Sequence, residues 1–323
     1  MKEFIGFTLA MLTASVLAGC GGGGGSGDTS SPVAVVPAAT SVSGTAAKGI
    51  VKQARVEVCR IVNGAPEADA TCASGTTGAD GSYSVTMSDG YTGPAMVKVM
   101  AGTASAMMDE TTGADIPYNM TMRAVVPAVS RNTTVYVTPF SEMAASAVST
   151  TTIDATKISQ AIAAVQSAMA ALGIELSVMP MIDLKNNGAD PATLASQANM
   201  FKQMSRVAMA AKYSSLFKDS SGAACNATGT TTSQQFACAV SAMAGVMSAY
   251  VTADPTKTAN MLAALNAQNV TSVKMPIRKA NGTLDLESVD MTSLTSMITA
   301  MQNAGMTATD AQNAVNRMMG GMH

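Results

Sequence analysis

The chain has 323 residues, of which 47% are apolar and only 12% charged, enough for one large or two ordinary domains with a large core. Its 19 Lys and Arg against 21 Asp and Glu provide no positive field to collect phosphate, which argues against nucleic-acid binders and polybasic membrane docks. Its one His, His323, excludes every mechanism that needs an internal imidazole, including His-ligated zinc sites.

Residues 1–19 have the pattern of a secretory signal. A charged start at Lys2 precedes an apolar run from Phe4 to Leu17, and small residues follow as far as Cys20. The run is too short to span a bilayer as a mature helix. Residues 20–41 are rich in Gly, Ser and Pro, which predicts a flexible tether.

The end of this signal, Leu17-Ala18-Gly19-Cys20, resembles the lipobox of bacterial lipoproteins. The resemblance implies that Cys20 is acylated and becomes the first residue of a protein that partners the membrane through its lipid. Gly21 resembles the outer-membrane sorting pattern of Gram-negative lipoproteins, which implies an outer-membrane location in the bacterial envelope. The alternative is a plain secretory signal, which would leave Cys20 as an unpaired thiol.

Four further cysteines form two well-separated pairs with the same internal spacing, Cys59 with Cys72 and Cys225 with Cys238. Local pairing is the simplest of the three possible connectivities. Each closed loop of about 14 residues would contribute roughly 3 kcal/mol to stability. The oxidising envelope favours disulfides. A metal site is the alternative, but all four sulfurs would have to converge without any CxxC spacing.

Residues 42–137 have the pattern of a β-domain. In the run 55–61, Val56 and Val58 alternate with charged Arg55 and Glu57 and should face a core, whereas Cys59 and Ile61 fall on the opposite face. Short strands separated by turn residues are typical of a sandwich. The further strands expected are 83–87, 95–100 and 134–137.

Three segments of this region, 43–46, 54–58 and 77–85, resemble the carboxypeptidase regulatory-like, transthyretin-like β-sandwich. The resemblance implies an Ig-like fold in which a Gly-Thr strand opens the domain and an Asp-Gly turn leads into the third strand. That turn is Asp80-Gly81, where Asp can bond its own backbone and Gly can take a positive φ. Any Ig-like hairpin can also show such a turn.

The junction near residue 138 is a helix start. Thr138 can cap, Pro139 suits the first turn, and Glu142 would lie near the positive end of the helix dipole. The segments 108–113, 122–126 and 137–144 resemble bacterial surface lipoproteins that join the sandwich to a helical domain. That likeness implies an architecture and says nothing about chemistry.

Residues 138–323 are predicted to form a helical domain. Apolar stripes of helical period and Ala-rich faces favour a compact α-helical bundle, so the predicted fold class is α+β with two domains. Around Asn281-Gly282, residues 271–287 can form a hairpin or a loop. The stripes lie in the segments 158–172, 194–211, 236–250, 261–265, 291–301 and 307–319.

Two clusters have a possible metal chemistry. The end of the chain offers soft ligands for Cu(I), although Met318 also continues a helix, and the weak candidates are Met318, Met319, Met322 and His323. A second cluster offers oxygens for Ca²⁺ without EF-hand spacing, so a solvated loop is favoured there, and it contains Asp109, Glu110 and Asp115.

We therefore expect a lipid-anchored, non-enzymatic envelope protein without a cofactor, in a structural, adhesive or assembly role. Its expected partner is an envelope protein or a surface polymer, and not a nucleic acid. The alternative function is a binding module for a small apolar ligand or a soft metal, held in a Met-rich helical domain.

Overall fold

The computed structural model describes part of the chain, and every described residue belongs to the compact unit Pro37–His323, the other unit being Met1–Val36. The described residues are 38–109, 113–149, 152–170, 182–183, 206, 217–219, 221–251, 272–278, 284–290, 295, 298–299, 302, 307–309 and 311–312. The predicted signal, Cys20 and the Met and His residues at positions 318–323 lie outside this set.

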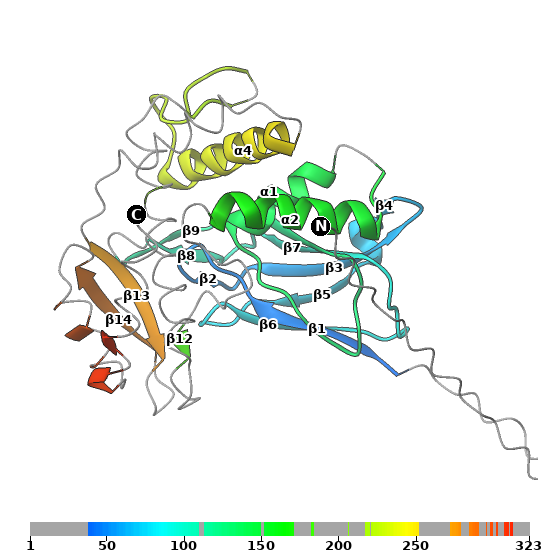
Figure 1. Cartoon of the computed structure of the whole chain (residues 1–323), viewed down its shortest axis with the longest axis horizontal. Coiled ribbons are helices and arrows are strands. Elements are labelled where there is room, and N and C mark those ends of the chain that lie inside the picture. The colour runs from blue at the N-terminus through cyan, green and yellow to red at the C-terminus, as the bar shows by residue number, and fades with distance from the viewer. Residues whose placement is uncertain are drawn as a thin grey trace, which may run out of the picture. The chain divides into compact units, whose positions relative to one another are not determined.

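Two sheets share one hydrophobic core (Figure 1). In the first, β1 (Thr40–Thr45) lies between antiparallel β6 (Ser82–Met87) and parallel β11 (Asn132–Thr134). In the second, all pairs are antiparallel, and β3 contacts β4, β5 and β7. The strands of the second sheet are β10 (Thr121–Val126), β7 (Ala95–Met100), β3 (Arg55–Val62), β4 (Ala65–Pro66) and β5 (Ala73–Thr76).

A smaller sheet joins three short strands in the order β2, β8, β9. It pairs Val51 with Met107 and Met107 with Ile116, so β8 is its central strand. The bounds are β2 (Val51–Lys52), β8 (Ala106–Met108) and β9 (Asp115–Pro117).

The period of β3 is predicted correctly for its core face but not for its other face. Val56 and Val58 are fully buried and pack in the common core, as expected. Arg55 is exposed, but Glu57 is also fully buried, although its charge indicated a solvated position. The reason is that the short 3₁₀ helix η1 (Asp69–Thr71) packs close to β3.

Two turns contain a glycine with positive φ. At the predicted Asp80-Gly81 turn, Ser82 N donates to Asp80 Oδ1 over 3.1 Å and Gly81 has φ of +76°. Asn63 and Gly64 both have positive φ and join β3 to β4 as a two-residue hairpin. Asn-Gly is the typical sequence of such a turn.

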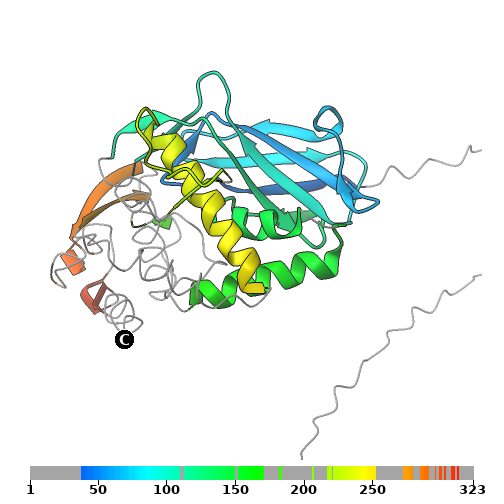
Figure 2. The same cartoon turned by 90° about the horizontal axis from the view of Figure 1, so that it is seen from above.

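The helix α1 (Pro139–Val148) begins as predicted. Thr138 Oγ1 accepts a hydrogen bond from Ser141 N over 3.2 Å, and Ser141 Oγ accepts one from Thr138 N over 2.9 Å. The helix α1 and the next helix, α2 (Ala155–Ala170), both contact β10, while α4 (Thr232–Val251) packs against α1 and α2 (Figures 1 and 2).

The predicted fold class, α+β with a C-terminal helical bundle, is wrong. The described part of the chain is mostly β-sheet with three α-helices, and α1 and α2 pack on a strand as well as on α4. Strands also occur within the predicted bundle, where β13 and β14 form an antiparallel pair and β12 joins β13 in parallel. The bounds are β12 (Ile182–Asp183), β13 (Ser272–Arg278) and β14 (Leu284–Asp290).

The strand pair β13–β14 covers most of residues 271–287, for which a hairpin or a loop was expected. The segment SVKMPIR alternates polar and apolar residues with the period of a strand. The expected helices at 194–211 and 261–265 lie almost wholly outside the described residues. Within the described residues, no helix is both long and apolar enough to cross a membrane.

Candidate functional site

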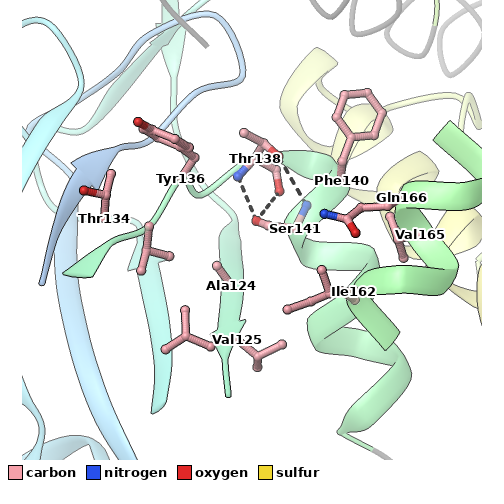
Figure 3. Close-up of a pocket in the computed structure, with 13 residues that line it drawn as sticks. Ala124, Val125, Thr134, Tyr136, Thr138, Phe140, Ser141, Ile162, Val165 and Gln166 are labelled. Carbon is pink, nitrogen blue, oxygen red and sulfur yellow. Dashed lines mark hydrogen bonds between the residues drawn. The ribbon is translucent and has the colours of Figure 1, made fainter. Parts of the chain in front are cut away.

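An apolar pocket of about 300 Å³ lies where β10 and the segment leading into α1 meet the helices α1 and α2 (Figure 3). This volume is at the lower end of the range for small-molecule sites. The pocket is lined by Ala124, Val125, Val126, Thr134, Val135, Tyr136, Thr138, Phe140, Ser141, Ala144, Ile162, Val165 and Gln166.

The pocket has a buried apolar base and a polar rim. Phe140 and Val165 are at most 2% exposed, whereas Thr134 and Gln166 are exposed. Figure 3 shows Thr134 and Tyr136 on the strand side and Gln166 on the helix side. This arrangement can hold a small apolar body and offer hydrogen bonds to a polar group at the mouth.

The polar atoms of the rim differ in availability. Ser141 Oγ donates to Arg123 O over 2.8 Å and takes part in the cap with Thr138, so both hydroxyls are already used by the fold. The Tyr136 hydroxyl is protonated at neutral pH and can donate, and burial raises its pKa further above the ordinary value. Tyr136 and Gln166 are therefore the rim groups suited to a ligand.

One ion pair holds the two walls of the pocket together. The Glu142 carboxylate accepts from Arg123 N over 2.6 Å and from Arg123 Nε over 3.1 Å, and Ser146 Oγ donates to it over 2.8 Å. Arg123 belongs to β10 and Glu142 to α1. The expected role of Glu142 was at the positive end of the helix dipole, and no local pattern indicates its partner Arg123, which lies 19 residues earlier.

Both predicted disulfides are present with local connectivity, Cys59 to Cys72 and Cys225 to Cys238. The second bond ties α4 to the preceding loop. In that loop the Asp219 carboxylate accepts from Ser221 Oγ over 2.6 Å and from Ala223 N over 3.0 Å. The hydrogen bond from Ser221 is the main cause that lowers the pKa of Asp219.

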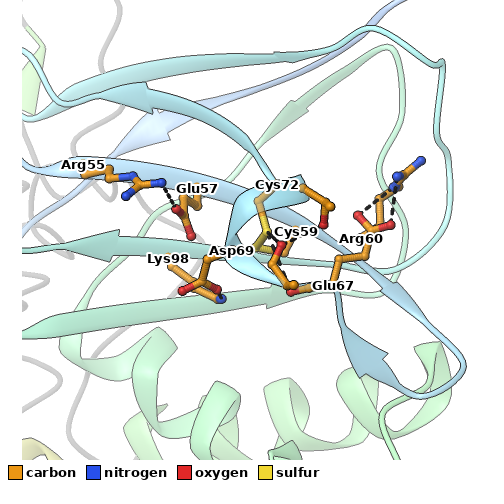
Figure 4. The surroundings of a disulfide bond; sticks show 10 residues. Arg55, Glu57, Cys59, Arg60, Glu67, Asp69, Cys72 and Lys98 are labelled. Carbon is orange, nitrogen blue, oxygen red and sulfur yellow. Dashed lines mark hydrogen bonds and ion pairs between the residues drawn. A yellow bond between two sulfur atoms is a disulfide. The ribbon is translucent and has the colours of Figure 1, made fainter.

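Charged residues surround the first disulfide (Figure 4). Glu57 forms an ion pair with Arg55, and Lys98 forms one with Asp69 of η1. Further along β3, Arg60 pairs with Glu67 over 2.8 Å. The Lys98–Asp69 pair joins η1 to β7, and the Arg60–Glu67 pair joins a residue before η1 to β3, whereas Arg55 and Glu57 both belong to β3.

Most of the remaining sequence candidates lie outside the described residues. These are Cys20, Met318, Met319, Met322, His323 and Glu110. Asp115 pairs with Lys52 over 2.8 Å, and Asp109 N donates to Ala114 O over 2.8 Å in the adjoining turn. The acidic stretch thus has the contacts of a structural loop. None of these carboxylates lines the pocket. The pocket's lining residues come from three separate segments of the chain.

Comparisons with protein-family models, with curated proteins and with solved structures return no match for this chain.

Proposed function

We propose that the chain is a lipid-anchored protein of the bacterial cell envelope, in the outer membrane, with a structural, adhesive or assembly role and no catalytic activity. The lipobox-like end of the signal at Cys20 carries this proposal. The two disulfides of the body support it, because such bonds persist in oxidising compartments. An envelope protein or a surface polymer is the proposed partner.

The same proposal includes the relation of residues 42–137 to the carboxypeptidase regulatory-like sandwich, which they resemble in sequence. Its support is the Asp80-Gly81 turn and the close approach at Gly44, where a Cβ atom would lie 1.8 Å from Val135 O. A signal at 1–19 is proposed with it, followed by a tether that ends before β1. No separate second domain from 138 is proposed, because the described residues on both sides of 138 belong to one compact unit and share one core.

The anchoring is tested by Cys20→Ser in a Gram-negative host. We expect the native chain in the outer-membrane fraction, with a diacylglyceryl group on Cys20 by mass spectrometry of the N-terminal peptide. The variant should leave that fraction or accumulate as an unprocessed precursor, while Ser31→Ala in the tether should behave as the native chain. A Cys20→Ser chain that is processed and remains in the membrane fraction contradicts the proposal.

A second candidate function is the binding of a small apolar molecule, and the pocket beside α1 and α2 favours it. The predicted place for such a ligand was a Met-lined helical domain, whereas this pocket is lined by Val, Ala, Ile and Phe and by no Met. The ligand class that fits is a compact apolar body with one hydrogen-bonding group, placed toward Tyr136 and Gln166.

Native mass spectrometry of the chain purified from its own host tests this candidate. We expect a retained small molecule in the native chain and its loss in Ile162→Trp, because Ile162 lines the pocket and a larger side chain would fill it. Ala163→Trp is the matched control on the exposed side of the same helix. Equal retention in both variants would show that the molecule binds elsewhere, and an empty native chain removes the candidate.

A further inference from the structure

Two cysteines and two carboxylates converge beside β3 (Figure 4). The ligand atoms of Glu57, Cys59, Asp69 and Cys72 all lie within 4.8 Å of one another. Glu57 and Cys59 are alternate residues of β3 and point to one face of the sheet, whereas Asp69 lies in η1 and Cys72 directly follows it. The fold therefore gathers sulfur and oxygen ligands from two segments.

Glu57 is the unusual member of this cluster. Its side chain is 0% exposed, yet no described residue donates a hydrogen bond to either carboxylate oxygen. Its ion-pair partner Arg55 is 57% exposed, so that guanidinium remains largely in water. Buried carboxylates are normally satisfied by hydrogen bonds or by a metal. Oε1 of Glu57 contacts the Arg55 guanidinium, whereas Oε2 has no hydrogen-bond partner among the described residues, so this free acceptor beside the sulfur atoms points to a second cation.

We propose that Glu57, Cys59, Asp69 and Cys72 form a zinc site whenever a reductant opens the Cys59–Cys72 disulfide, which otherwise persists in the oxidising compartment of the proposed function. A dithiol reductant supplies two electrons and two protons, its own disulfide forms, and the Cys59–Cys72 bond breaks to give two thiols. Zinc then displaces both thiol protons to water and binds the two thiolates and the two carboxylates. Zinc is typically four-coordinate and tetrahedral and accepts both thiolate sulfur and carboxylate oxygen, so two of each suit it.

The charges around the cluster fit a divalent ion. Two thiolates and two carboxylates carry four negative charges, and zinc neutralises two of them. The cations Arg55 and Lys98, which pair with Glu57 and Asp69, balance the other two. Sulfur ligands disfavour Ca²⁺ and Mg²⁺, which select oxygen. The loop between Cys59 and Cys72 would then be closed in either redox state, by a sulfur–sulfur bond or through the metal.

Cobalt titration of the full chain in detergent tests this site, because thiolate-bound Co²⁺ has a charge-transfer band in the near ultraviolet. The chain is reduced with a phosphine, since a dithiol would itself bind cobalt. We expect one Co²⁺ per reduced chain at the site, displaced by zinc, and no band in the oxidised chain. The variant Cys59→Ser/Cys72→Ser should lose the band, and Cys225→Ser/Cys238→Ser should retain it.

The carboxylates separate the proposed site from a pair of free thiols. Glu57→Gln and Asp69→Asn should each weaken cobalt binding by about tenfold or more. Glu67→Gln is the control, because Glu67 pairs with Arg60 outside the cluster. Asp69 is 61% exposed, so Asp69→Asn tests the site even where Glu57→Gln disturbs the fold.

Three results would overturn the proposal. The first is cobalt binding by the reduced chain that neither carboxylate variant weakens, which would indicate thiols alone. The second is equal binding by the oxidised and reduced chains. The third is the absence of a folded reduced site, seen either as no thiolate band at micromolar cobalt or as loss of the β-sheet circular dichroism on reduction.

Discussion

Replacing Glu142 with Ala should destabilise the protein more than any exposed ion-pair substitution. Its side chain is 10% exposed and that of Arg123 is 26% exposed, so both charges are partly withdrawn from water. The Ala variant removes the acceptor of the Arg123 backbone N–H as well as of its guanidinium. The Ser146 hydroxyl loses the same acceptor.

The expected loss in the free energy of unfolding is about 3 kcal/mol. A hydrogen bond to a charged group contributes about 1.5–3 kcal/mol, and breaking a fully buried pair costs about 3–5 kcal/mol. Arg123 keeps some access to water and a hydrogen bond from Nη1 to Ser149 Oγ at 3.1 Å, which places the estimate at the lower end. The control Asp115→Ala should cost about 1 kcal/mol or less, because its pair with Lys52 is exposed.

Urea unfolding followed by far-ultraviolet circular dichroism measures these values. A double-mutant cycle with Glu142→Ala and Arg123→Met should give a coupling energy of about 1.5–3 kcal/mol, because the two side chains are in direct contact. A coupling energy below about 0.5 kcal/mol would refute the reasoning, since it would place this pair among ordinary surface ion pairs.

Three smaller predictions concern turns and caps. Thr138→Ala should lower the free energy of unfolding by about 1 kcal/mol in urea titration, since it removes the α1 cap. Gly81→Ala should lower the free energy of unfolding by about 2 kcal/mol, because φ is positive and the new Cβ would lie 2.8 Å from a carbonyl oxygen. Gly222→Ala is the control, because its new Cβ would meet no atom, and it should lower that free energy by about 1 kcal/mol in the same titration. NMR titration should show a lowered pKa for Asp219, and Ser221→Ala should raise it. The stabilisation by this carboxylate is present above its unfolded-state pKa and is lost as the pH falls through its folded-state pKa.

The elements that the sequence predicted are those fixed by neighbouring residues. The alternation in 55–61, 83–87 and 95–100 reports on the strand itself, and all three segments are strands. The same holds for the Thr138 cap, whose partner is three residues away. Cysteine spacing identified both disulfides because each closes a short local loop.

The candidate sites depended on contacts that no local period contains. Alternation placed Glu57 opposite the core, but it could not show that η1 would cover that face. The pocket joins residues from Ala124 to Gln166 across two strands and two helices. A helical stripe likewise shows that a face is buried, not whether it packs on helices or on a strand, which is why a bundle was predicted.

The chain has few charged residues, and some of them link segments of the fold. With 12% charged residues, few ion pairs are available, and several of those described connect a covering segment to a strand. Glu142 fixes α1 to β10, and Asp69 fixes η1 to β7 through Lys98. Because apolar faces pack without direction, a small number of ion pairs can specify which segment covers which strand. The Arg123–Glu142 pair thus links β10 to α1, two elements that line the pocket, and the Lys98–Asp69 pair acts with the Cys59–Cys72 disulfide in holding η1 beside Glu57.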